Sequence, residues 1–278
     1  MYKTILVHVN GTARSTERTR VAARLAARYE AHLVGAAMTG LSPYMFPIGS
    51  MEDGVPAVVF PIKELRDEAY RALDQFETTA SSEGVNSYER RIIDDEPGMG
   101  MSLQARYSDL IVVSQTTLDD FRPRLRTDFL EYVLFNGSRP ALILPQFPVQ
   151  SEVGRSVTVA WNGSPEAVRA ITTAIPLLKR AQKVNLVVLN AGKEADLRGE
   201  DPGADIALYL ARHGIKVEVT ATNAGRDDGD ALLSFASDTG ADLIVMGAYG
   251  HSRFREFLVG GMTRTALASS PLALWMSH

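Results

Sequence analysis

The sequence predicts an α/β protein with two doubly wound domains, each built on a parallel sheet of about five strands. Two observations carry this prediction. Short continuous apolar runs alternate with segments of helical periodicity, which is typical of a parallel sheet covered by helices on both faces. Sequence blocks also recur in the same order in the two halves of the chain, which indicates a duplicated domain.

Three pairs of blocks make up the repeat. Ile5–Thr12 matches Val157–Ser164, Ser108–Ser114 matches Ala241–Gly247, and Ser138–Leu144 matches Ser269–Trp275. A polar, proline-containing stretch at 145–154 separates the two copies, as expected of a linker. The predicted domains are therefore residues 1–147 and 153–278.

The expected elements alternate in both copies. In the first copy we expect strands at 4–9, 32–38, 87–93, 109–114 and 140–144, with helices near 15–29, 63–82, 97–106 and 127–136. In the second copy we expect strands near 156–161, 184–189, 215–221, 242–247 and 271–276. Ligands of such sheets bind beyond the carboxyl ends of the strands, so chemistry is expected there.

One segment of the first copy has no counterpart in the second. The block offsets give the first copy about 19 more residues between its first and fourth strands, and Leu41–Ile62 is the place where they fit. This segment is rich in Pro, Gly and aromatic residues. It is either a long surface loop or a flap over a pocket, since long loops in compact domains are often functional.

Composition limits the function classes. The net charge is −4 and the pI about 5.8, so nothing global indicates a nucleic-acid partner or an anionic membrane surface. The absence of cysteine excludes disulfides, thiolate metal sites and cysteine nucleophiles. The sequence shows neither a signal peptide nor an apolar run of the roughly 20 residues that span a bilayer, so a cytoplasmic location is expected.

A glycine-rich loop in the second copy is the strongest functional motif. An apolar strand runs into Gly247-x2-Gly250, and Gly260-Gly261 follows nine residues later, before a predicted helix. Glycines let backbone N–H groups approach a ligand, and a helix start adds unpaired donors, so the loop is a candidate phosphate cradle. The alternative is that these glycines only close ordinary turns. Arg253 is either a phosphate contact or a solvated loop residue.

These residues resemble a tandem universal stress protein. The nucleotide-binding signature of that family is G-x2-G-x9-G-[S/T], and the second copy follows it from Gly247 to Gly260. Further family-like stretches are Ala160–Ser164, Asp230–Ala236 and Ala241–Gly247. The resemblance covers nearly the whole chain, in two copies.

The resemblance implies two flavodoxin-like sheets of the adenine nucleotide alpha hydrolase type, related by a pseudo-two-fold axis. It implies ATP or another adenosine nucleotide, with or without Mg²⁺, in the second copy. The implied contacts are Ala160, Asn162 and Leu189 near the adenosine, Met246, Gly247 and Gly250 at the ribose and phosphates, and Gly260, Gly261, Met262 and Thr263 at the phosphates. No residue is expected to bind a metal directly. The implied assembly is an intramolecular pseudo-dimer through the last strands, with homodimers of chains and an unknown protein partner left open.

The chain departs from the family pattern at three places. Asn162 stands where the family usually has Asp, and Gly261 replaces the Ser or Thr of the signature, so Thr263 is the nearest hydroxyl. In the first copy, Phe129-Leu130 stand where Gly260-Gly261 do, and acidic residues at 119, 120 and 128 would repel phosphate. We therefore expect nucleotide in the second copy alone.

Three functional hypotheses remain open. The first is a stress-response protein that binds adenosine nucleotide in the second copy for regulation, with weak ATPase activity at most. The second is a stress-related interaction protein that binds no nucleotide, and the third is a slow ATP hydrolase. No catalytic residue can be named, because the sequence has no G-x4-G-K-[S/T], G-x-S-x-G or H-E-x-x-H motif.

Overall fold

A computed structural model of the chain describes residues 1–41, 62–115, 129–147, 149, 152–189, 203–222, 227–249 and 261–278. The chain divides into two compact units. The N-unit comprises Tyr2–Arg139, and the C-unit comprises Pro140–His278 together with Met1. No helix within the described ranges is long and apolar enough to cross a membrane.

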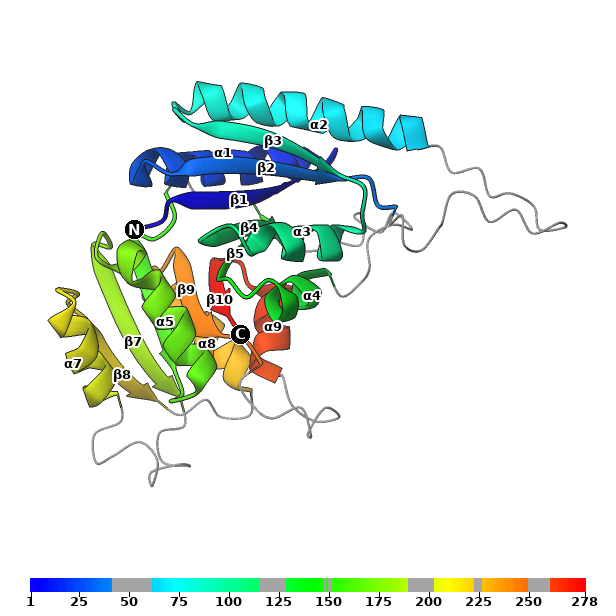
Figure 1. The fold of residues 1–278 in the computed structure, drawn as a ribbon. Helices are drawn as coiled ribbons and strands as arrows, with labels where there is room; N and C mark the ends of the chain where they lie inside the picture. Colours follow the sequence, from blue (N-terminus) through cyan, green and yellow to red (C-terminus); the bar gives the residue numbers. More distant parts are fainter. Residues whose placement is uncertain are drawn as a thin grey trace, which may run out of the picture. The chain divides into compact units, whose positions relative to one another are not determined.

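The N-unit is a doubly wound α/β domain. Its elements are β1 (Thr4–Val9), α1 (Ala13–Tyr29), β2 (His32–Met38), α2 (Ile62–Ser82), β3 (Tyr88–Ile93), α3 (Pro97–Ala105), β4 (Leu110–Ser114) and α4 (Phe129–Asn136). The strands pair in parallel in the order β3-β2-β1-β4. Helices α1 and α2 pack together on one face of this sheet, and α3 and α4 pack together on the other (Figure 1). The predicted elements of this unit are confirmed to within two residues.

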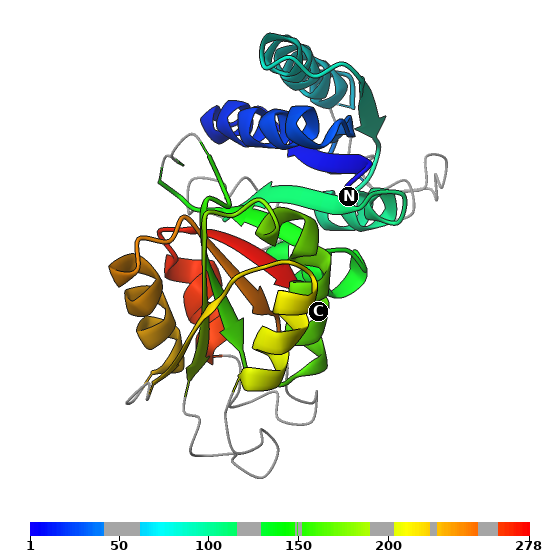
Figure 2. The same cartoon turned by 90° about the vertical axis from the view of Figure 1, so that its left-hand side faces the viewer.

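The C-unit has the same architecture. Its elements are β5 (Ala141–Leu144), β6 (Ser156–Trp161), α5 (Pro165–Leu178), β7 (Lys183–Leu189), α7 (Ala204–Arg212), β8 (Glu218–Thr222), α8 (Asp228–Asp238), β9 (Leu243–Gly247), α9 (Gly261–Ser269) and β10 (Ala273–Ser277). The strand order is β5-β10-β9-β6-β7-β8. Figure 2 shows α8 and α9 on one face of the sheet, with α5 and α7 on the other. The predicted fold class, with parallel sheets covered by helices on both faces, is therefore confirmed.

One predicted strand starts three residues too early. The sequence predicts a strand from 215, whereas β8 begins at Glu218. Gly214 has a φ of +79°, and the N–H of Ile215 donates to the carbonyl of Leu210 at 3.0 Å. This is the geometry that ends a helix through a left-handed glycine. The buried side chain of Ile215 therefore belongs to the end of α7 and not to the strand.

The last strand of the first sequence copy lies in the C-unit. Strand β5 pairs antiparallel with β10, with Ile143 opposite Leu274 and Leu142 opposite Trp275. Because these backbone bonds join β5 to the second copy, the compact unit begins at Pro140, ahead of the limit of 147 that the linker composition indicates. Trp275 is fully buried, and its indole N–H donates to the hydroxyl of Thr173 at 3.2 Å.

Matching aspartates fix the start of β1 in the N-unit and of β6 in the C-unit. The carboxylate of Asp242 accepts from the N–H groups of Gly154, Arg155 and Ser156 at 2.6, 2.9 and 2.9 Å. Asp109 accepts from the N–H groups of Lys3 and Thr4 at 2.6 and 3.0 Å. Burial raises the pKa of Asp242, and the three backbone N–H groups oppose that shift. Both aspartates lie at the amino ends of the strands, so they serve the fold.

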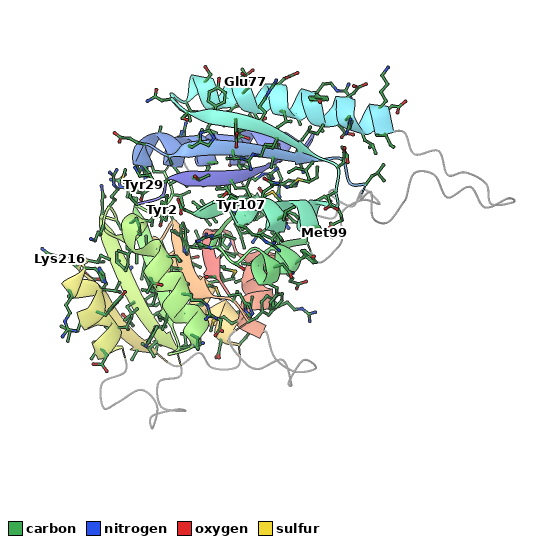
Figure 3. All side chains as sticks on the ribbon, in the orientation of Figure 1. Tyr2, Tyr29, Glu77, Met99, Tyr107 and Lys216 are labelled. Atoms are coloured by element: carbon green, nitrogen blue, oxygen red, sulfur yellow. The ribbon has the colours of Figure 1, made fainter. Side chains whose placement is uncertain are left out.

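Aromatic packing closes the N-unit next to Asp109. Tyr2 and Tyr29 meet edge to face, with ring centroids 4.9 Å apart, and Figure 3 shows the two side chains next to each other. Tyr29 is the last residue of α1, so this pair joins the end of that helix to the start of β1. This contact lies at the amino ends of the strands. The carboxyl ends lie at the opposite edge of the sheet.

Candidate functional site

The candidate site lies at the carboxyl edge of the C-unit, by which we mean the side of the sheet where its parallel strands end. The chain leaves β6 toward β7 on one side and leaves β9 toward β10 on the other. The carboxyl ends of β6 and β9 are therefore the point where the strand order reverses, which is where ligands bind in doubly wound sheets. The two strands pair in register, with Val157 opposite Leu243 and Val159 opposite Val245.

Residues at the end of β6 provide one side of the site. Ala160 is partly exposed and Asn162 is exposed. The side-chain oxygen of Asn162 accepts from the N–H of Ser164 at 3.1 Å, and the hydroxyl of Ser164 accepts from the N–H of Ala167 at 3.2 Å. Ser164 thus caps α5, and Asn162 shapes the turn before it. The amide NH2 group of Asn162 is not used in that turn, so it can serve as a donor to a ligand.

Leu189 lies next to this turn. It is the last residue of β7, and the register that pairs Trp161 with Val188 places it level with Asn162. The side chain of Leu189 is buried. The structure therefore brings Ala160, Asn162 and Leu189 together at neighbouring strand ends.

Gly247 has a structural reason to be glycine that the sequence did not reveal. A Cβ atom at this position would lie 2.6 Å from the backbone nitrogen of Ala167 and 2.8 Å from the carbonyl carbon of Glu166. The first turn of α5 therefore packs directly against the end of β9. This contact alone accounts for a glycine, so Gly247 is weaker support for a nucleotide than its place in the motif indicates. Met246, just before it, is only 2 % exposed and its side chain packs in the core.

The first turn of α9 provides the other side of the site. Gly261 is exposed, and among the residues that the structure describes no atom lies within 4 Å of the position its Cβ would take. Met262 is partly exposed. Thr263 is buried, and its hydroxyl oxygen accepts from the N–H of Tyr249 at 3.2 Å. Thr263 thus connects the segment after β9 to α9, while its own hydroxyl proton can still be donated to an anion.

Tyr249 is a residue that sequence reasoning missed. It has a φ of +57°, in the left-handed region that non-glycine residues seldom adopt. Before it, the N–H of Ala248 donates to the carbonyl of Ser277 at 2.9 Å, and Nδ1 of His278 lies 3.0 Å from the carbonyl oxygen of Ala248. No sequence motif marks these contacts. Tyr249 bonds to Thr263, 14 residues away, and Ala248 to His278, 30 residues away, which is beyond the reach of helix or strand periodicity.

Three predicted contacts, Gly250, Arg253 and Gly260, lie outside the described residues. Within the described ranges, no group of three or more His, Asp or Glu side chains is placed to hold a metal ion. Asp227 and Glu96, which belong to acidic sequence runs, accept from backbone N–H groups at the starts of α8 and α3. These two acids therefore act as helix caps.

The comparison with known proteins identifies the C-terminal part of the chain. Residues 154–278 match the sequence model of the Universal stress protein family. We refer to this matched part of the chain as the Usp domain. This Usp domain contains the whole candidate site, from Ala160 to Thr263.

Other comparisons extend beyond the Usp domain. A stretch of 148 residues, 51 % of this chain, is 25 % identical to Universal stress protein Slr1230 of Synechocystis sp., and it spans 48 % of that relative, about half of its length. A universal stress protein structure from Archaeoglobus fulgidus is similar over 99 % of this chain and 97 % of its own, with a TM-score of 0.73 and 17 % identity. A Pseudomonas aeruginosa protein of unknown function covers 99 % of this chain and 92 % of its own, with a TM-score of 0.61 and 14 % identity. These structural likenesses show the fold of both units.

Proposed function

We propose that the Usp domain binds ATP or a related adenosine nucleotide at its carboxyl edge, and that the bound nucleotide regulates a role in stress response. The observation that carries the proposal is the open first turn of α9. Gly261 is exposed, and none of the described residues comes within 4 Å of its Cβ position, so a ligand can approach the backbone N–H groups of this turn. A helix start offers unpaired donors and the positive end of the helix dipole, which together favour phosphate.

The adenosine end of the ligand would lie at the ends of β6 and β7. Ala160 has only a methyl side chain and is partly exposed, so a flat ring can approach the backbone there. Leu189 lies beside the turn that follows β6, at the end of β7, and the amide of Asn162 offers hydrogen bonds to a ribose or a base. The phosphates would then extend toward Gly261, Met262 and Thr263, with Gly250, Gly260 and Arg253 as further contacts proposed from the sequence.

Magnesium is not proposed to bind side chains of this site directly. Asn162 carries no charge where the family usually has a carboxylate, and Mg²⁺ bound with nucleotides is held mainly by phosphates, water and one or two carboxylates. Any Mg²⁺ would therefore arrive with the nucleotide, and binding should depend less on Mg²⁺ than in a site with an aspartate at this position.

A role without nucleotide is the second candidate, and two contacts favour it. Gly247 is accounted for by the close packing of α5, and the hydroxyl of Thr263 already holds the N–H of Tyr249. Both residues thus have structural reasons to be present. In this case the Usp domain would act through a protein partner alone.

Substitution of Gly261 separates the two candidates. Titration calorimetry of nucleotide-free protein with ATP should give saturable binding to the wild type and to Gly261→Ser, which restores the family hydroxyl. Gly261→Asp should bind at least about tenfold more weakly, because a carboxylate there repels phosphate. Both side chains fit against the described part of the chain, since none of its atoms lies within 4 Å of the new Cβ.

The fold is controlled within the same pair of variants. An acidic residue in the first turn of a helix is favoured by the helix dipole, so Gly261→Asp should unfold no more readily than the wild type. Equal ATP affinity of the Asp and Ser variants, or no saturable heat with the wild type at millimolar ATP, would refute the nucleotide proposal. Phosphate release in the same samples measures whether the bound ATP is slowly hydrolysed.

A further inference from the structure

The carboxyl edge of the N-unit contains a buried arginine. Arg18 of α1 is only 3 % exposed. Its Nε donates to the backbone carbonyl of His8 at 2.6 Å, Nη1 to the hydroxyl of Ser114 at 3.1 Å, and Nη2 to the side-chain oxygen of Asn10 at 3.1 Å. The three acceptors come from the ends of β1 and β4. All three nitrogens of the planar guanidinium group therefore donate a hydrogen bond.

The acceptors stand at positions equivalent to predicted ligand contacts of the Usp domain. Strand β1 pairs with β4 in the register Ile5 opposite Leu110, and β6 pairs with β9 in the matching register Val157 opposite Leu243. Counting from these pairs, His8 corresponds to Ala160, Asn10 to Asn162, and Ser114 to Gly247. Arg18 corresponds to Ala170, which has only a methyl group as its side chain.

The surroundings of Arg18 complete a built site. The ring of His8 is buried and packs on Phe129 of α4, with ring centroids 5.1 Å apart. Burial, and secondly the charge of Arg18, lower the pKa of His8 well below its ordinary value, so His8 is neutral and adds no second positive charge. Arg14, one turn earlier in α1, donates to the carbonyl of Gln115 at 3.0 Å. The two equivalent positions thus differ: Ala160 of the Usp domain is partly exposed, whereas the larger side chain of His8 is buried in the N-unit.

We infer that the carboxyl edge of the N-unit is a binding site for a planar guanidinium cation, and that the chain's own Arg18 occupies it. The fork of N–H donors is matched by a backbone carbonyl, an amide oxygen and a hydroxyl, all of which accept hydrogen bonds. The N-unit therefore holds an internal ligand where the Usp domain would take an external one. This inference does not depend on nucleotide binding by the Usp domain.

Chemical rescue tests the inference. Arg18→Ala removes the atoms of ethylguanidinium from the site. We expect the unfolding midpoint of the N-unit to fall by roughly 10 °C, because three buried or partly buried hydrogen bonds are lost together. Ethylguanidinium chloride at about 10 mM should raise that midpoint again in proportion to the logarithm of its concentration above its dissociation constant. Tetramethylammonium chloride at equal concentration should not.

Matched controls come from the same helix. Arg20→Ala removes an exposed arginine that pairs with Glu83 at 3.3 Å, so ethylguanidinium should not stabilise this variant or the wild type. Equal responses of all three proteins, or no response of Arg18→Ala, would overturn the inference. If Arg18→Ala does not fold alone, it should fold when ethylguanidinium is present during refolding, and failure there also overturns it.

Discussion

The two carboxyl edges of this protein are built on the same strand order and register, and they differ in side-chain size. In the N-unit, His8, Arg18 and Ser114 form a largely buried polar network around the partly exposed Asn10. At the equivalent positions the Usp domain has Ala160, Ala170 and Gly247 around Asn162. Since both sheets have the same topology, the fold itself requires neither set. The comparison teaches that one architecture can be completed by an internal cation or left with small residues that a ligand can approach.

The helix starts at the two edges differ in the same direction. In the N-unit, α4 begins with Phe129 and Leu130, which are both buried, and Phe129 contacts His8. In the Usp domain, α9 begins at Gly261, which is exposed and has no neighbour within 4 Å of a Cβ position in the described ranges. An apolar helix start closes one edge, and an open glycine turn leaves backbone donors accessible at the other.

Exchanging residues between the edges should have the largest effect at Gly247. Gly247→Ser introduces the residue of the N-unit and places a Cβ 2.6 Å from the nitrogen of Ala167, so we expect a loss of about 3 kcal/mol in the unfolding free energy. The reverse exchange, Ser114→Gly, should cost about 1 kcal/mol through the lost bond to Arg18.

Urea denaturation followed by tryptophan fluorescence measures the first exchange, because the only tryptophans, Trp161 and Trp275, both lie in the C-unit. Far-UV circular dichroism follows the unfolding of both units. A circular dichroism transition without a matching change in fluorescence therefore measures unfolding of the N-unit. Wild-type stability of Gly247→Ser would show that close packing of α5 does not explain this glycine.

Removing the two matching aspartates should give an intermediate effect that is larger in the C-unit. Asp242→Ala leaves three backbone N–H groups without their acceptor and should cost about 2 kcal/mol, whereas Asp109→Ala leaves two and should cost about 1 kcal/mol. The same two optical probes separate the units. A larger loss for Asp109→Ala would contradict the view that the number of N–H donors sets the effect.

The smallest expected effect is a pH dependence of the N-unit at His8. The folded pKa of His8 is lowered by burial and by Arg18, so below pH 6.5 the unfolded chain binds more protons than the native state. Stability should therefore fall as the pH falls, by about 1 kcal/mol between pH 7 and pH 5.5.

Measuring denaturation of wild type and His8→Asn across this pH range isolates the His8 contribution. The variant keeps a polar side chain and loses the titration, so its stability should change less with pH. Parallel curves for the two proteins would show that His8 is not held neutral in the native state.

Much of the fold could be predicted because strand and helix periodicities are local. The elements of the N-unit were predicted to within two residues, and β8 was misplaced only because Gly214 and Ile215 end α7. The candidate site was only partly accessible in this way. Its glycine turn and Asn162 are visible in a motif, whereas the contact between Tyr249 and Thr263 follows from a backbone conformation that no motif records.

By itself, the sequence determined the alternation of strands and helices and the order of the elements. Tertiary structure alone decided why Gly247 is a glycine and what Arg18 does. The physical reason is the distance along the chain. Gly247 meets Ala167 across 80 residues, and Arg18 reaches Ser114 across 96, so only the packed sheet brings these groups within hydrogen-bond or contact distance.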